Sequence, residues 1–323
     1  MAGTHSMKDA LYDKVSTRVA FGEALLKQAD KNEKIMYIAA DTLKSVGGAP
    51  MQKKYPARAL NVGIAEQDMA LMGAGMASCG AKVFIATYAV FASMRITEQI
   101  RSFICYPNLD VKIIGALGGL SGGQEGVTHQ GIEDIGVLRA IPRLVIVEAA
   151  DAASVEAIVE AITEYTGPVY LRLGRDAVPK VFDSGYQFRI GKANIMKGSG
   201  KDAALITNGA AVARTVAAEK ILRGQGYDVQ LIEMPCVKPI DREAIENAAK
   251  QTGLVVTVED HTVIGGLGSA VSEVLTDSCP VKLLRIGLND CYAESGDFDE
   301  LLDKYGLSAA SIAEKAGAAV KAK

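Results

Sequence analysis

The sequence predicts an α/β protein made of two doubly wound domains, and three observations support this fold class. At 323 residues, the chain is longer than one ordinary domain. Apolar residues make up 49% of it, which is enough to fill two cores and argues against disorder. Helical and strand patterns alternate along most of its length. This alternation is typical of mostly parallel sheets with helices on both faces.

The first alternating block predicts a domain over residues 15–188. Apolar residues recur at helical spacing over 15–30, and a buried strand follows that ends at Asp41. A further helix begins at Glu66. Beyond it, the pattern predicts strands over 81–89, 110–117, 144–150 and 167–174, and helices over 95–106, 132–141 and 153–165.

A second block predicts a domain over residues 189–323. The chain is polar and rich in turn residues over 175–202, so we place the boundary near residue 188. Strands are then predicted over 203–210, 227–235, 254–261 and 281–288, with helices over 211–226, 241–253 and 266–277. We expect residues 1–14 to be disordered or derived from a tag.

Composition and charge argue against several classes of protein. The net charge is −3 and no basic stripe appears, so we expect no nucleic-acid partner. The longest apolar run, 69–81, is too short to span a bilayer, and no secretory signal pattern is visible. Five cysteines form no C-x-x-C pair, and the three histidines lie apart from any cysteine pair. These features predict a cytoplasmic protein without a metal site of its own.

Candidate site residues follow the predicted strands, because ligands of open α/β sheets bind at the carboxyl ends of the strands. Glu66 opens a helix that contains Gly73 and Gly75, each costing about 1 kcal/mol relative to alanine. The glycines predict close approach of another group to that helix. An acid in a first helical turn also stabilises the helix by about 0.3–1 kcal/mol, so the residue type alone leaves a structural role open.

A glycine-rich segment over residues 115–131 is the second candidate. Its bare backbone lets a ligand approach closely, and it presents hydrogen-bonding and titratable groups together: Gln124, Glu125, Thr128, His129 and Gln130. A functional loop is favoured over a flexible lid because histidine is rare in this chain. Arg172 and Arg175 end a later strand, where one of them could bind an anion. The turn over 259–271 lacks the dinucleotide pattern, and its glycines suit helix packing.

Four segments in this order resemble the transketolase family of thiamine-diphosphate enzymes: NVGIAEQDM, TYAVFASMRITEQIR, GGLSGGQEGVTHQGIEDIGVLRAIP and PVYLRLGRD. The resemblance is strong over residues 17–182 and looser over 202–323. It implies a pyrimidine-binding domain followed by the family's C-terminal domain. The family's G-D-G motif, which holds the diphosphate through Mg²⁺, is missing, because the only Gly-Asp pair is Gly296–Asp297. The chain therefore resembles the C-terminal subunit of a split transketolase, with the Mg²⁺ ligands expected on an N-terminal partner subunit.

The resemblance also implies roles for single residues at the cofactor. Glu66 matches the glutamate that bonds to N1′ of the aminopyrimidine and promotes its imino tautomer. The cofactor's own amino group then takes the proton from the thiazolium carbon. Phe91 matches the aromatic residue that stacks on the aminopyrimidine, and Tyr88 lines the same pocket.

On the substrate side, the resemblance assigns His129 and Glu125 to the sugar, with Glu125 in place of the usual aspartate. Arg18, Ser45 and Arg175 match residues that hold a sugar phosphate, and Asp41 matches one near the sugar hydroxyls. Two departures bear on the choice of substrate. Leu117 or a neighbour replaces a second substrate-facing histidine, and Met94 replaces a tyrosine.

The expected activity is transfer of a two-carbon ketol unit between phosphorylated sugars, in an assembly of two copies of this chain and two of the partner. The β subunit of a 2-oxoacid dehydrogenase shares the architecture and is the main alternative. A non-catalytic subunit that retains the fold is another. A deoxyxylulose-phosphate synthase is usually a single chain, which argues against it.

Overall fold

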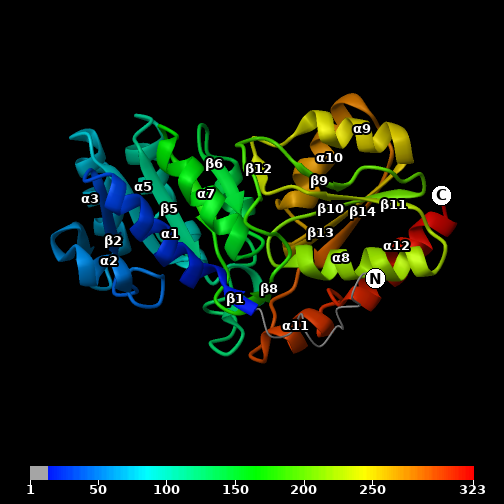
Figure 1. The fold of residues 1–323 in the computed structure, drawn as a ribbon, viewed down its shortest axis with the longest axis horizontal. Helices are drawn as coiled ribbons and strands as arrows, with labels where there is room; N and C mark the ends of the chain where they lie inside the picture. Colours follow the sequence, from blue (N-terminus) through cyan, green and yellow to red (C-terminus); the bar gives the residue numbers. More distant parts are fainter. Residues whose placement is uncertain (1–13) are drawn as a thin grey trace.

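The computed structural model describes residues 14–323, which fold into two α/β domains lying side by side (Figure 1). The expectation for residues 1–14 falls outside the described residues, except for Lys14. That residue begins β1 (Lys14–Ser16), which pairs with β8 (Ala177–Pro179) in a short antiparallel ribbon.

The first domain is built on a seven-stranded sheet in the order β12-β6-β7-β5-β4-β2-β3. Six strands are parallel: β2 (Ile35–Ala39), β3 (Ala59–Asn61), β4 (Lys82–Tyr88), β5 (Val111–Ala116), β6 (Val145–Glu148) and β7 (Val169–Arg172). The edge strand β12 (Cys236–Lys238) is antiparallel to β6 and comes from the second half of the chain. Because buried parallel strands carry apolar residues on both faces, each face needs a layer of helices.

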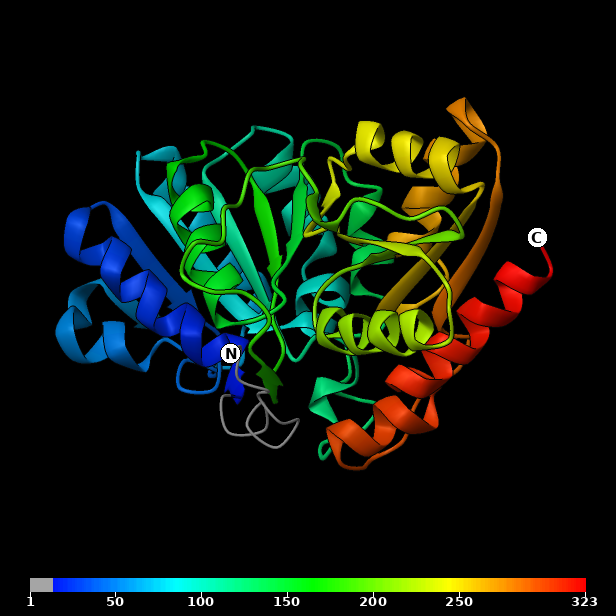
Figure 2. The ribbon, with the colours of Figure 1, turned by 45° about the vertical axis from the view of Figure 1, so that its right-hand side comes forward.

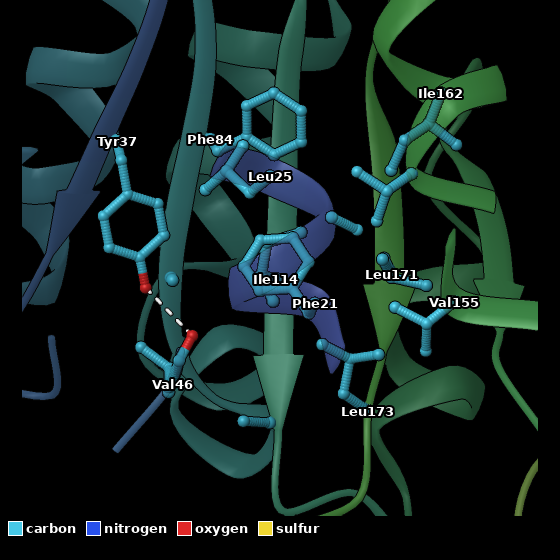
Figure 3. Packing of buried hydrophobic residues seen from close by; sticks show 14 of the residues in the cluster. Phe21, Leu25, Tyr37, Val46, Phe84, Ile114, Val155, Ile162, Leu171 and Leu173 are labelled. Atoms are coloured by element: carbon cyan, nitrogen blue, oxygen red, sulfur yellow. Dashed lines mark hydrogen bonds between the residues drawn. The ribbon is translucent and has the colours of Figure 1, made fainter. Parts of the chain in front are cut away.

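Two helices, α1 (Thr17–Lys31) and α7 (Ala152–Glu164), cover one face of this sheet. Phe21 and Leu25 of α1 pack there against Phe84 and Ile114 of the sheet (Figure 3). The other face is covered by α3 (Glu66–Ser78), α4 (Ala89–Met94), α5 (Thr97–Gln99), η3 (Ile100–Cys105) and α6 (Asp134–Arg139). The short elements α2 (Ala49–Lys54), η2 (Pro56–Arg58) and η4 (Gly119–Gly122) lie in the connections.

The second domain has a five-stranded sheet in the order β14-β13-β10-β11-β9. Four strands are parallel, β10 (Ala203–Thr207), β11 (Val229–Glu233), β13 (Leu254–Thr262) and β14 (Lys282–Leu288), and β9 (Asn194–Lys197) is an antiparallel edge. One face is covered by α8 (Ala211–Gly224), α11 (Phe298–Lys304) and α12 (Ala309–Lys321). The other is covered by α9 (Arg242–Thr252) and α10 (Leu267–Ser278) (Figure 2).

The predicted fold class, two doubly wound α/β domains, is confirmed. Several features were not predicted. The strand β12 belongs by sequence to the second block but completes the first sheet, so the two domains are not consecutive in sequence at this point. A strand of three residues has too little pattern to be recognised, and its partner strand is about 90 residues away. The helices α11 and α12 were also not predicted.

Within residues 14–323, every helix is too short or too polar to cross a membrane. The same residues contain no group of three or more His, Cys, Asp or Glu side chains placed to hold a metal ion.

Candidate active site

The predicted site residues gather at the carboxyl end of the first sheet, around β2. The next two strands in sequence lie on opposite sides of β2, β3 on one side and β4 on the other. The strand order therefore reverses at β2, and a crevice at such a switch point is the usual ligand position of an open α/β sheet.

Three aromatic rings form the centre of this site. Tyr88 ends β4, Phe91 lies in the first turn of α4, and His129 comes from the glycine-rich loop. The His129 ring lies 5.6 Å from Tyr88 and 5.7 Å from Phe91, centroid to centroid, and the two phenyl-type rings are 5.7 Å apart. The Nδ1 atom of His129 is 2.9 Å from Oγ1 of Thr128. The fold thus brings residues from positions 88, 91 and 129 into one cluster.

Hydrogen bonds connect these rings to Arg18, and a separate ion pair connects the glycine-rich loop to Arg175. The hydroxyl of Tyr88 is 3.1 Å from Oγ of Ser45, and the backbone oxygen of Ser45 accepts a hydrogen bond of 2.6 Å from Nη1 of Arg18. Arg175 forms an ion pair with Glu125 of the glycine-rich loop. The residues predicted to bind phosphate, Arg18, Ser45 and Arg175, therefore lie next to the aromatic cluster.

The electrostatics around the two arginines favour an anionic ligand. Burial lowers the pKa of Arg18, and the charge of Arg175 lowers it further. The Nε atom of Arg18 is buried and has no hydrogen-bond partner among the described residues. Burial also raises the pKa of Asp176, against the effect of both arginines. Two facing cations, one with an unused donor, can bind an anion and relieve their repulsion.

Asp41 lies at the edge of the same crevice. It follows β2 in the left-handed conformation, with φ of 58°. Its N–H donates to Oδ1 of Asn61, 2.9 Å away, and the Asn61 amide donates to Oδ1 of Asp41 at 3.4 Å. A depression of about 410 Å³ is lined by Asp41, Leu43, Lys44, Ser45, Gln52 and Asn61. Sequence reasoning missed Asn61, whose only signal is its place at the end of β3.

Glu66 is the first residue of α3, and its side chain is buried, with 5% of the residue exposed. The neighbouring Gln67 donates to the backbone oxygen of Arg95 at 3.4 Å, which joins the start of α3 to the end of α4. No hydrogen bond or ion pair among the described residues joins Glu66 to Tyr88, Phe91 or His129.

The two glycines of α3, where close approach of another group was expected, lie in different surroundings. A Cβ on Gly73 would lie 2.7 Å from Cγ2 of Ile85, so the helix packs closely on β4 there. At Gly75, by contrast, no described group from outside α3 lies within 4 Å of the Cβ position.

The structure also places three further residues that the sequence singled out. Arg172 cannot bind a ligand, because it is 1% exposed and its donors are used inside the protein. Leu117 is buried in the first core, with φ of 59°, so its side chain does not face the site. Met94 is 51% exposed, at the end of α4.

The fold and this site define a two-domain α/β protein with an aromatic and cationic crevice at the switch point of its first sheet. Residues 13–180 match the transketolase pyrimidine-binding domain, and residues 191–312 match the transketolase C-terminal domain. The chain belongs to the transketolase family.

Several relatives are separate subunits of this family. A 6-deoxy-6-sulfo-D-fructose transketolase subunit from a Clostridium species is 36% identical over 93% of this chain and 92% of its own length. An apulose-4-phosphate transketolase subunit from Phocaeicola vulgatus is 37% identical over 94% of this chain and 96% of its own. A split-gene transketolase solved as an inactive β4 tetramer has a TM-score of 0.88 and 41% identity, covering 95% of this chain and 99% of that one.

Proposed function

We propose that this chain is the C-terminal subunit of a split thiamine-diphosphate-dependent transketolase. Together with an N-terminal, diphosphate-binding subunit, it transfers a two-carbon ketol unit between phosphorylated sugars. The observation that carries the proposal is the position of Glu66, a residue only 5% exposed that opens α3 just beyond the carboxyl end of β3, beside the switch-point strand β2. A carboxyl group in this position can exchange a proton with a ligand bound in the crevice.

The described residues fit thiamine diphosphate. Glu66 would share a proton with N1′ of the aminopyrimidine, while Phe91 and Tyr88 offer aromatic faces for its ring. When bound, the cofactor supplies the carbanion chemistry that ketol transfer needs. Mg²⁺ would be held by the partner subunit, since residues 14–323 contain no cluster suited to a metal.

The remaining residues would bind the sugar substrate. Arg18 and Arg175 would hold its anionic end, together with the Ser45 hydroxyl. His129 and Glu125 would contact the sugar beside the aromatic rings, and Asp41 would contact its hydroxyls. Two relatives act, by their names, on a sulfo sugar and a phosphorylated sugar, which supports an anionic substrate here. The two neighbouring arginines, Arg18 and Arg175, favour this function over a 2-oxoacid dehydrogenase subunit, whose substrate carries no phosphate.

The test is Glu66→Gln in the complex with the partner subunit. We expect ketol transfer to fall by at least about 100-fold, the scale of positioned proton transfer. Asp68→Asn is the matched control, because Asp68 is exposed in the same first turn and shares only the helix-dipole effect. Equal, small losses in both variants would reject the cofactor role of Glu66.

A further inference from the structure

The second domain has its own switch point, and the first domain occupies it. In the second sheet, β10 lies between β11 and β13, so a ligand would be expected beyond the carboxyl ends of these three strands. Glu148, at the end of β6 in the first domain, lies there instead. Its N–H donates to the backbone oxygen of Pro235, just after β11, at 2.9 Å. Its carboxyl group packs on Gly209, just after β10, so tightly that a Cβ would not fit.

Arg172 is the centre of this contact between the domains. Its Nε donates to the carboxylate of Asp134 at 3.0 Å, and its Nη1 pairs with Glu148. Its Nη2 donates to the backbone oxygens of Gly131, at 2.7 Å, and Asp260, at 3.0 Å. Asp260 belongs to β13 of the second domain, so one buried guanidinium joins both domains and the end of the glycine-rich loop.

The start of α10 in the second domain is also occupied by a carboxylate of the protein. Glu259 accepts hydrogen bonds from the N–H groups of Leu267, at 2.7 Å, and Gly268, at 2.8 Å. These are the donors that a phosphate would use at a helix N-terminus. The described residues thus fill the crevice with their own side chains.

The glycine-rich loop rests on the second domain at three points. The N–H of Leu120 donates to the carboxylate of Asp260 at 3.1 Å. The backbone oxygen of Gly123 accepts from the N–H of Gly296 at 3.0 Å, and Gln130 donates to the backbone oxygen of Glu294 at 3.0 Å. Glu125 and His129 lie between these points. The base of the loop is bonded to the first domain, where Gly118 N–H donates to Leu173 at 3.0 Å.

We infer that the switch-point crevice of the second domain is a docking socket for the first domain, and that Arg172 and Asp260 are positioning residues of the active site. They act through the loop over 118–131, which they hold so that His129 stays against Tyr88 and Phe91. The effect on catalysis rests on the proposed function, whereas the effect on the loop does not.

The test compares Asp260→Ala with Arg172→Lys, which retains the charge but loses the planar fork of donors. Hydrogen exchange of the amides of residues 118–131 is measured in the full chain, and kcat and KM for ketol transfer are measured in the assembled complex. We expect loop exchange to rise by about 10-fold or more, and kcat/KM to fall by about 10- to 100-fold, the scale of a misplaced catalytic group. Asp260→Asn, which retains an acceptor oxygen for Leu120, should restore much of the loop protection.

The matched control is Glu273→Gln. It breaks the ion pair with Arg139, another contact between the domains, which is exposed and does not touch the loop. Loop exchange and kinetics as in the parent chain are expected for this control. The inference is overturned if a folded Asp260→Ala or Arg172→Lys chain retains normal loop exchange and normal kcat/KM. If one of these two variants does not fold, the result for the other variant decides whether the inference holds. If the unsubstituted complex shows no ketol transfer, the proposed function fails, and hydrogen exchange still decides whether the socket holds the loop.

Discussion

At the scale of single residues, Arg175 is placed where it can bind an anion. It is half-buried and paired with Glu125, close to the charge of Arg18. An incoming phosphate would compete with the Glu125 carboxylate for the same guanidinium. Binding of a charged sugar would thus release Glu125 towards the substrate.

Arg175→Ala should raise the KM for phosphorylated sugars by about 10- to 100-fold, the scale of lost hydrogen bonds to a charged group. Steady-state kinetics of the assembled complex, with a phosphorylated sugar and its unphosphorylated analogue, measures this. Lys27→Ala, at an exposed ion pair on α1, is the control and should leave the KM unchanged. An unchanged KM for Arg175→Ala would remove this residue from the anion site.

At the scale of elements, α3 contains two glycines in different surroundings. Gly73→Ala should destabilise the chain, because overpacking against Ile85 costs about 1–3 kcal/mol and exceeds the gain in helix propensity. Gly75→Ala should stabilise it by about 0.5–1 kcal/mol, since its Cβ meets nothing in the described chain. Urea unfolding of the full chain measures both, and equal shifts would contradict the packing argument.

Buried carboxyl groups near the carboxyl ends of the strands predict a pH-dependent stability. Burial raises the pKa of Glu259 to about 8 and that of Glu148 to about 7. Between pH 5 and pH 8, the folded chain therefore binds more protons at these groups than the unfolded chain, and their contribution to stability falls as pH rises. His261, whose pKa burial lowers to about 4, acts in the opposite direction between about pH 4 and its ordinary value near 6.5.

We therefore expect the free energy of unfolding to decrease from pH 7 to pH 8, where His261 of the unfolded chain is already mostly neutral and offsets little of the effect. Glu259→Gln should reduce this slope by up to about 1.4 kcal/mol per pH unit. Urea unfolding at several pH values measures it. Glu156→Gln, an exposed glutamate on α7, should leave the slope as it is. A slope that Glu259→Gln does not change would show that Glu259 takes up no proton on folding.

At the scale of the whole molecule, the chain is expected to work only in an assembly. We expect light scattering of the chain with partner and cofactor to give the mass of two copies of each subunit. A monomer under these conditions would contradict the proposed assembly.

A pull-down of the chain from its native lysate identifies that partner. Recovery of a chain with a G-D-G motif and no lipoyl protein would support a split transketolase. Recovery of a dehydrogenase α subunit with a lipoyl acyltransferase would instead favour 2-oxoacid oxidation.

The sequence by itself determined the fold class and the family, because alternating periodicity and four ordered motifs are local signals that survive without tertiary contacts. The strand-end positions of Asp41, Tyr88 and His129 also predicted that these residues lie at one edge of a sheet. The family resemblance assigned the anion to Arg175, and only the tertiary structure shows why Arg172, three residues earlier on the same strand end, cannot share that role. Arg172 lies inside a buried charge cluster and Arg175 in the crevice, because the second domain covers only Arg172. Only the tertiary structure could place β12 in the first sheet and Glu148 in the socket of the second. Such contacts depend on residues about 60 to 90 positions apart, whose pairing no local pattern encodes.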